Sequence, residues 1–163
     1  MTITRDVDTQ PTVVAIVQAL LAVPGVTGDH TVNGYEGVGT RVYPDANIGP
    51  ESGGAAQDFP YLIVTAASAL VPFDYTSAYL DALFDITVVD RQHTPNNLKG
   101  GTQNVVPVAA AALARLVNQP LTVSGYASVT VAPDGAPRGS AFVQVGLTYR
   151  QRAFTVRVQA VKQ

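Results

Sequence analysis

Residues 139–161 read GSAFVQVGLTYRQRAFTVRVQAV, a stretch in which apolar and polar side chains alternate and no proline interrupts the chain. Apolar residues occupy odd-numbered positions from Val143 to Tyr149 and even-numbered positions from Phe154 to Ala160. The period of two predicts one long β-strand, and the change of phase predicts a bulge or bend near residues 151–153. Such a strand far exceeds the usual length of about five or six residues. We therefore expect part of it to contact another chain.

The composition is that of one folded domain with few charges. The 163 residues, 47% of them hydrophobic, suffice for a single core of ordinary size. Charged residues make up 13%, about half the roughly 25% of an average soluble domain, so much of the surface must consist of small and uncharged polar residues. Such a surface suits burial against partners.

Charge and cysteine content exclude several classes of function. The net charge is -2, and the ten Lys and Arg residues are scattered along the chain, which argues against sequence-directed binding of nucleic acid. Cysteine is absent, which excludes disulfides and thiolate metal sites. Residues 1–10 are polar, and no apolar run approaches the roughly 18 residues of a membrane helix. We expect a soluble chain with no membrane partner.

The remaining chain alternates between helical and extended patterns. Apolar residues recur at helical spacing after Pro11 and again after Asn104, which can cap the second helix. Residues 25–57 are dense in Gly, Asn, Asp and Pro, which predicts a flexible loop. In order, the expected elements are a helix at 13–21, a short extended piece at 40–43, strands at 59–66 and 79–90, a helix at 104–116, a strand at 121–131, a turn at 134–135 and the long final strand.

This order predicts one domain over residues 1–163, with residues 151–163 as a strand extension at its C-terminus. We expect an α+β two-layer sandwich, in which two helices pack on one face of a mainly antiparallel sheet of four or five strands. Within strand 79–90, strict alternation separates a core-facing set from a polar set that includes Asp81 and Asp85. The expected core-facing residues of this strand are Ala82, Phe84, Ile86 and Val88.

No catalytic, cofactor or metal site is expected. The two histidines, His30 and His93, fall in predicted loops, and the chain contains no Gly-x-Ser-x-Gly elbow. The glycines of residues 34–39 lack the preceding strand and the following Lys-Ser or Lys-Thr of a phosphate loop. The sequence therefore predicts a protein that is not an enzyme. A remote alternative is a small-molecule binding module or hydrolase around His93, Asp90 and Tyr61.

Asp81 and Asp85 share one face of their strand but stand about 13 Å apart at roughly 3.3 Å per residue, too far for a glycosidase pair. Arginines on the final strand could grip acidic residues of a partner, and solubility of an edge strand is the competing explanation. The expected partner interface consists of Arg150, Arg152, Phe154, Val156, Arg157 and Val158.

Several short motifs carry a resemblance to a known family. They are RVYPD at 41–45, DFPYLIV at 58–64, LFDITVVD at 83–90, the Ala-rich helix that ends near Leu116, and FVQVGLTYR at 142–150. Together they resemble the tail terminator (tail completion) proteins of tailed bacteriophages. The order of the elements is the main likeness, and it covers most of residues 11–150. The chain departs from the family pattern at residues 26–57 and 151–163.

The resemblance implies a structural virion protein. Members assemble as a ring, usually hexameric, on the head-proximal end of the tail tube, where they stop tube polymerisation and offer the surface to which the head docks. The implied partners are further copies of the chain, the major tail tube protein and a head-completion or connector protein. The chain would be assembled in the host bacterial cytoplasm and reside in the tail or neck of the virion. A head-completion or neck connector protein at the same junction is the alternative.

A ring through which DNA passes has little use for basic residues in its lumen, because contacts with phosphates would retard transit. Under this resemblance we expect Asp81 and Asp85 to face the lumen, and DNA to pass without specific binding. Head-to-tail contacts close into a ring when the rotation permits. Strand addition at the long final strand is the expected way to make those contacts.

Overall fold

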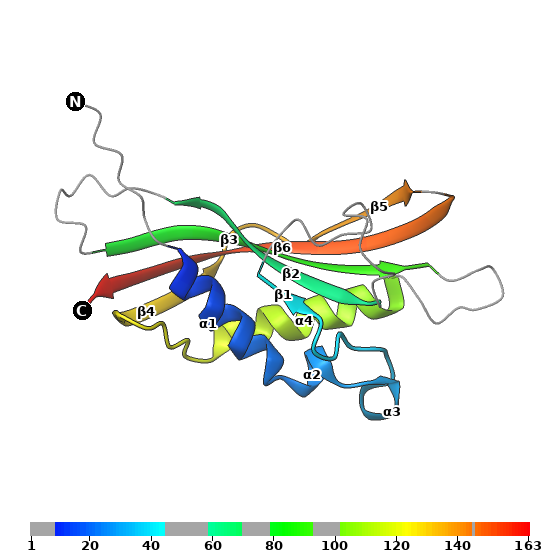
Figure 1. Ribbon diagram of the computed structural model, residues 1–163, viewed down its shortest axis with the longest axis horizontal. Helices are drawn as coiled ribbons and strands as arrows, with labels where there is room; N and C mark the ends of the chain where they lie inside the picture. Colours follow the sequence, from blue (N-terminus) through cyan, green and yellow to red (C-terminus); the bar gives the residue numbers. More distant parts are fainter. Residues whose placement is uncertain (1–8, 45–58, 70–78, 93–101, 145) are drawn as a thin grey trace.

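The computed structural model describes residues 9–44, 59–69, 79–92, 102–144 and 146–163. A twisted sheet forms one layer, and the helices of the described residues form a second layer on one of its faces (Figure 1). This arrangement confirms the predicted α+β two-layer sandwich. The sheet has six strands and is mixed, and the described chain has four helices. Both numbers exceed the expectation.

Two long helices and two single turns make up the helical layer. Pro11 lies in the first turn of α1, where its missing N–H costs no hydrogen bond. The two single turns lie within the region expected to be a loop, and Asp29 caps the second by accepting a hydrogen bond from the Thr31 amide. Asn104 lies inside the last helix and does not cap it, because that helix begins at Thr102. The helices are α1 (Gln10–Leu21), α2 (Pro24–Thr27), α3 (His30–Asn33) and α4 (Thr102–Asn118).

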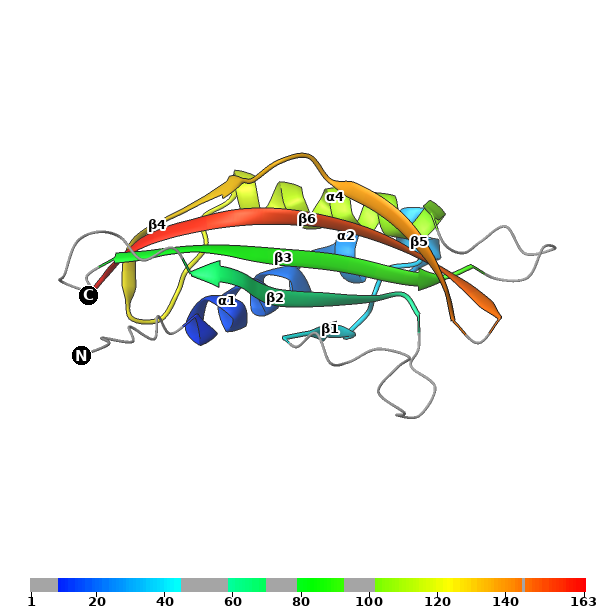
Figure 2. The same cartoon turned by 90° about the horizontal axis from the view of Figure 1, so that it is seen from above.

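The strands follow the order β1-β2-β3-β6-β4, and β5 also pairs with β6. The first pair is parallel and the others are antiparallel. Figure 2 shows β6 in the middle of the sheet, with β3 along one side and β4 and β5 in succession along the other. The strands are β1 (Val42–Tyr43), β2 (Tyr61–Ala69), β3 (Tyr79–Arg91), β4 (Tyr126–Pro133), β5 (Arg138–Gln144) and β6 (Leu147–Lys162).

The stretch 139–161 is two strands and not one. β5 and β6 form an antiparallel hairpin in which Gln144 pairs with Leu147, and Gly146 adopts a positive φ of 73° between them. Glycine adopts such a conformation without strain, which suits a tight reversal. The single-strand prediction was wrong because a hairpin keeps the same alternation of side chains on both of its arms.

The predicted bulge near residues 151–153 is also absent. β3 and β6 pair through thirteen consecutive residues, from Tyr79 with Val161 to Arg91 with Tyr149, with no shift of register. The change of phase in the sequence instead marks a change in which face is buried. Tyr149 packs among aromatic residues on one face, and Phe154 packs beneath the helices on the other.

β6 has no free backbone edge along most of its length. β3 occupies one edge, and β4 and β5 occupy the other. Strand addition at the final strand is therefore wrong, since its hydrogen-bonding groups are already paired within the protomer. The edges of the described sheet belong to β1 and β2 on one side and to β4 and β5 on the other.

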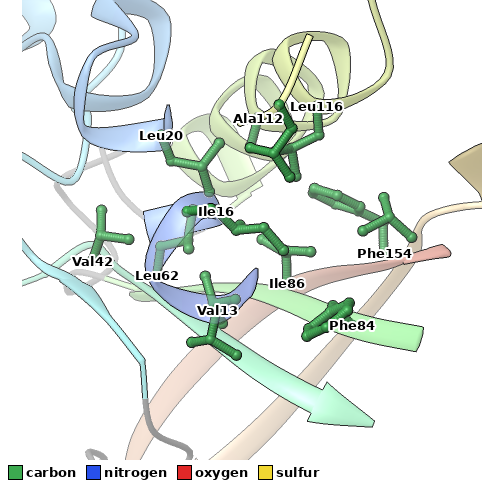
Figure 3. Packing of buried hydrophobic residues seen from close by; sticks show 14 of the residues in the cluster. Val13, Ile16, Leu20, Val42, Leu62, Phe84, Ile86, Ala112, Leu116 and Phe154 are labelled. Carbon is green, nitrogen blue, oxygen red and sulfur yellow. The ribbon is translucent and has the colours of Figure 1, made fainter. Parts of the chain in front are cut away.

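The core fills the space between the helices and the sheet (Figure 3). Residues of α1 and α4 pack there against residues of β3 and β6. The side chains in contact are Ile16, Leu20, Leu116, Phe84 and Phe154, and each is at most 1% exposed. The four residues of β3 predicted to face the core, Ala82, Phe84, Ile86 and Val88, are fully buried, which confirms the alternation.

Replacement of Phe84 by Ala is expected to lower the free energy of unfolding by about 3–5 kcal/mol, because it leaves a cavity among fixed neighbours. Urea titration followed by circular dichroism measures the change. Val143→Ala, at a side chain that is 71% exposed, is the control and should change stability by less than about 0.5 kcal/mol. Equal effects of the two substitutions would contradict this placement of the core.

Candidate functional site: the two faces of the sheet

The sheet face that lies away from the helices, here called the far face, carries a row of interacting polar side chains. Arg157 donates from Nε to Oδ1 of Asp81 at 2.8 Å and from Nη2 to Oδ2 at 2.6 Å. Gln159 donates to the same carboxylate at 3.3 Å, and the Thr155 hydroxyl donates to Asp85 at 2.6 Å. We call these five residues the polar ladder. They come from β3 and β6 alone, so the register of those two strands sets their spacing.

The ion pair within the polar ladder perturbs both partners. Hydrogen bonding from Arg157, with help from Gln159, holds the pKa of the Asp81 carboxyl below its usual value. The same carboxylate raises the pKa of the Arg157 guanidinium. The geometry is bidentate, which is the strong form of this contact. The Arg157 side chain is still 44% exposed, so solvent screens the pair.

The predicted partner interface and the predicted lumen surface share residues of one face. Arg157 was expected at a partner interface and the two aspartates at a lumen, yet the structure brings Arg157 and Asp81 together on one face. A partner or a passing molecule that meets one residue meets the other. Arg157 neutralises Asp81, and Asp85 is held by a neutral hydroxyl, so the polar ladder carries a small net negative charge.

The other residues of the expected interface do not share that face. Three of them lie beneath the helices and are at most 1% exposed, namely Phe154, Val156 and Val158. In the folded protomer they belong to the core, so no partner can reach them. Arg150 and Arg152 are half-buried on the helix face, where they line small pockets beside α4. Since β6 is not an edge strand, solubility of an edge does not explain its arginines.

A buried polar contact that sequence reasoning missed ties the helix layer to the sheet. Asn104 donates from Nδ2 to Oδ2 of Asp90 at 2.7 Å, and its own Oδ1 accepts a hydrogen bond from the Glu36 amide at 3.0 Å. Asp90 and Asn104 are 1% and 4% exposed. The contact fixes α4 to the end of β3 and to the segment after α3. The polar Asn104 in an otherwise apolar helical stretch was the available signal.

The far face also carries an aromatic cluster at the end opposite the Asp81–Arg157 pair. Phe59 and Phe142 pack against Tyr149, and Tyr61 packs against Phe59, with the rings of Phe142 and Tyr149 stacked at 5.0 Å between centroids. The Arg91 guanidinium lies 5.6 Å from the centre of the Phe59 ring. Tyr61 and Tyr149 are 2% and 5% exposed. The cluster therefore stabilises this end of the sheet and offers little surface to a ligand.

The remote hydrolase constellation is not assembled. Tyr61 pairs with Val89 of β3, and both side chains lie on the far face. Asp90 follows Val89 along β3, so its side chain lies on the opposite face, where it contacts Asn104 of α4. His93 lies outside the described residues. His30 contacts Glu36 at 3.0 Å on the surface. Within the described ranges, no group of three or more His, Asp or Glu side chains is arranged to hold a metal ion.

None of the helices that the structure describes has the length and apolar content that crossing a bilayer requires.

Comparison with known proteins gives a likeness of fold. No protein-family model matches the sequence, and no curated protein matches it. Among solved structures, the chain is similar to a chain of the virion of a native gene transfer agent (GTA) particle, with a TM-score of 0.51 and 19% identity. The likeness covers 91% of this chain and 93% of that chain. The two chains therefore share a fold over nearly their whole length.

The Asp81–Arg157 pair predicts a pH dependence of stability. The folded-state pKa of Asp81 lies below the unfolded value of 3.8, so the unfolded chain binds the proton first as the pH falls. The contribution of the pair is full above that value and is lost as the pH falls through the lower folded-state pKa. The parent protein should therefore be more stable than Arg157→Gln at pH 7, and the difference should shrink below about pH 4.

Urea unfolding at a series of pH values measures this difference. Arg138→Gln is the control, because the Arg138 side chain is exposed and makes no hydrogen bond or ion pair among the residues that the structure describes. A gap between parent and Arg157→Gln that stays constant from pH 7 to pH 3 would show that the pair does not hold Asp81 in its ionised form.

Proposed function

We propose that this chain is a structural protein of a tailed, phage-like virion, where it forms a ring on the head-proximal end of the tail tube. The ring stops tube polymerisation and provides the surface to which the head docks. The observation that carries the proposal is the fold shared over nine-tenths of both chains with a chain from a GTA virion. The short motifs that resemble tail terminator proteins support it independently and supply the position within the virion.

The physical character of the chain agrees with such a role. Charged residues make up only 13% of the chain, so much of its surface consists of small and uncharged polar side chains that suit contact with partners. A ring is built from head-to-tail contacts that repeat until the rotation closes. One side of the ring matches the last ring of the tube, and the other side lacks the surface that a further tube ring needs. No cofactor takes part in this mechanism.

The polar ladder suits the wall of a channel for DNA. Neutralisation of Asp81 by Arg157 leaves no free cation in the polar ladder, and Asp85 adds a negative charge. Phosphates bind to unpaired Lys and Arg side chains with the release of counterions. A set of side chains without such cations lets DNA pass without holding it. We therefore assign the polar ladder, and with it Asp81 and Asp85, to the lumen of the ring.

Loss of this chain is expected to produce tails of uncontrolled length, because nothing then ends tube growth. The measurement is negative-stain electron microscopy of particles made without the chain, with tail length as the readout. Restoration of the chain from a plasmid is the control. Tails of normal length beside unattached, DNA-leaking heads would replace the terminator role with that of a head-completion or neck connector protein. Normal particles would overturn both roles.

Charge reversal of the lumen residues is expected to slow DNA passage. Asp81→Lys with Asp85→Lys leaves Arg157 unpaired and adds two cations, so phosphates bind to the wall. The matched control is the swap Asp81→Arg with Arg157→Asp, which keeps the ion pair and the net charge. Ejection of DNA triggered in purified particles is the measurement. Unchanged ejection by particles that assemble normally with the double lysine variant would remove these residues from the lumen.

A further inference from the structure

The outer side of α4 carries apolar surface that the described chain leaves open. From Val105 to Val117, Arg115 is the only polar residue of the helix. One side of α4 packs into the core, and the outer side includes Val106, which is 39% exposed, and Ala114, which is also exposed. A helix that is apolar all round is normally buried all round. The outer side of α4 therefore has the character of a contact surface.

That outer side forms one wall of a groove of about 370 Å³. Pro133 at the end of β4 and Pro137 ahead of β5 contribute to the opposite wall. Arg152 of β6 also lines the groove, where it is half-buried and makes no ion pair with any described residue. Surfaces that associate are complementary in charge as well as in shape. The complement of this groove is an apolar side chain with carboxylates beside it.

Val32 of α3 is the one large exposed apolar side chain of the described residues that has this setting. It is 70% exposed, and we call residues 29–36, with a carboxylate at each end, the α3 knob. The other large exposed apolar side chains lie in α1, α4, β5 and β6, which contain no acid, or at Tyr79 of β3. The acid nearest to Tyr79 along β3 is Asp81, which Arg157 neutralises.

The backbone of the α3 knob is fixed at both ends. Asp29 caps the turn, and hydrogen bonds from Thr31 hold the pKa of its carboxyl below the usual value, so it is ionised at neutral pH. At the other end, the Glu36 amide donates to Asn104 of α4 at 3.0 Å. The Glu36 carboxylate contacts only the exposed His30 among the described residues. The knob therefore presents one apolar side chain between two surface carboxylates.

The knob and the groove lie on different flanks of α4 and do not meet within one copy. Tyr35 of the knob donates its hydroxyl to the carbonyl of Gly25 in α2 at 2.7 Å, and Gly25 packs against Ala111 of α4. At 3.6 residues per turn, the groove residues Val106 and Leu113 are roughly 140–160° around the helix from Ala111. Figure 1 shows α3 at the rim of the helical layer, beyond α2. Each copy thus carries both complementary surfaces and can use them only with other copies.

We propose that the α3 knob of one copy docks in the groove beside α4 of a second copy. Val32 enters between α4 and the wall formed by Pro133 and Pro137, and the two carboxylates of the knob lie against Arg152. Two different surfaces of identical copies meet, so the contact is head-to-tail, the kind that closes into a ring. The inference rests on the ring of the proposed function and names the contact that builds it.

Charge exchange tests the pairing in the purified full chain. The groove variant Arg152→Glu and the knob variant Asp29→Asn with Glu36→Lys are each expected to weaken self-association at least ~10-fold, because each brings like charges together. Asparagine at position 29 keeps a side-chain acceptor for the cap of α3. The combination of all three substitutions should restore association. Sedimentation velocity measures association, and thermal melting checks that each variant is folded.

Lys162→Glu is the matched control, because it makes the same kind of charge reversal away from the groove. Lys162 is exposed and lies ten residues along β6 from Arg152, which is about 33 Å at roughly 3.3 Å per residue. It should leave association unchanged. A loss as large as that of Arg152→Glu would mean that net charge, and not the groove, controls association.

A cross-link tests the geometry in assembled particles. The chain has no cysteine, so Val32→Cys with Ala114→Cys places one thiol on the knob and one in the groove. Mild oxidation should give a ladder of disulfide-linked copies. Each single variant has one thiol per copy and should give no species larger than a linked pair.

The outcomes separate this contact from the proposed function. A purified chain that stays monomeric, a triple variant that fails to restore association, or oxidised particles without linked copies would overturn the contact. Overlong tails in particles that lack the chain would then leave the proposed function in place. Linked copies together with tails of normal length in those particles would keep the contact and remove the proposed function instead.

Discussion

Thirteen consecutive residue pairs join β3 to β6 without a shift of register, and the division of the molecule into two faces depends on them. A slip of one residue would move Asp81 and Asp85 into the apolar core and would place Phe84 and Ile86 on the far face. The free-energy cost of burying two carboxylates without partners is far larger than the stabilisation that any single hydrogen bond of the sheet provides. The register is therefore held by side chains as much as by the backbone.

Each face then has its own chemistry. On the helix face, Phe84 and Phe154 anchor α1 and α4, and the Asp90–Asn104 contact fixes the helix layer at one end. On the far face, the polar ladder and the aromatic cluster lie at opposite ends of the same two strands. Because β6 is paired along both edges, the arginines of this strand act through the faces of the sheet and not through its edge.

The chain has few charges, a sheet with one face free of helices among the described residues, and a helix with an apolar outer side, and these features suit the contacts with other chains that we propose. In the proposed ring, the polar ladder of the far face meets DNA.

The sequence by itself determined the α+β class, the first helix and the core-facing set of β3, because each follows from a local period of side chains. Only the tertiary structure decided that residues 139–161 form a hairpin, since one strand and two antiparallel strands have the same period of two. The meeting of Arg157 with Asp81, 76 residues apart, and of Asn104 with Asp90 likewise depends on which segments lie side by side. A local pattern states which side chains share a face, but the partner across the sheet is chosen by packing between distant segments.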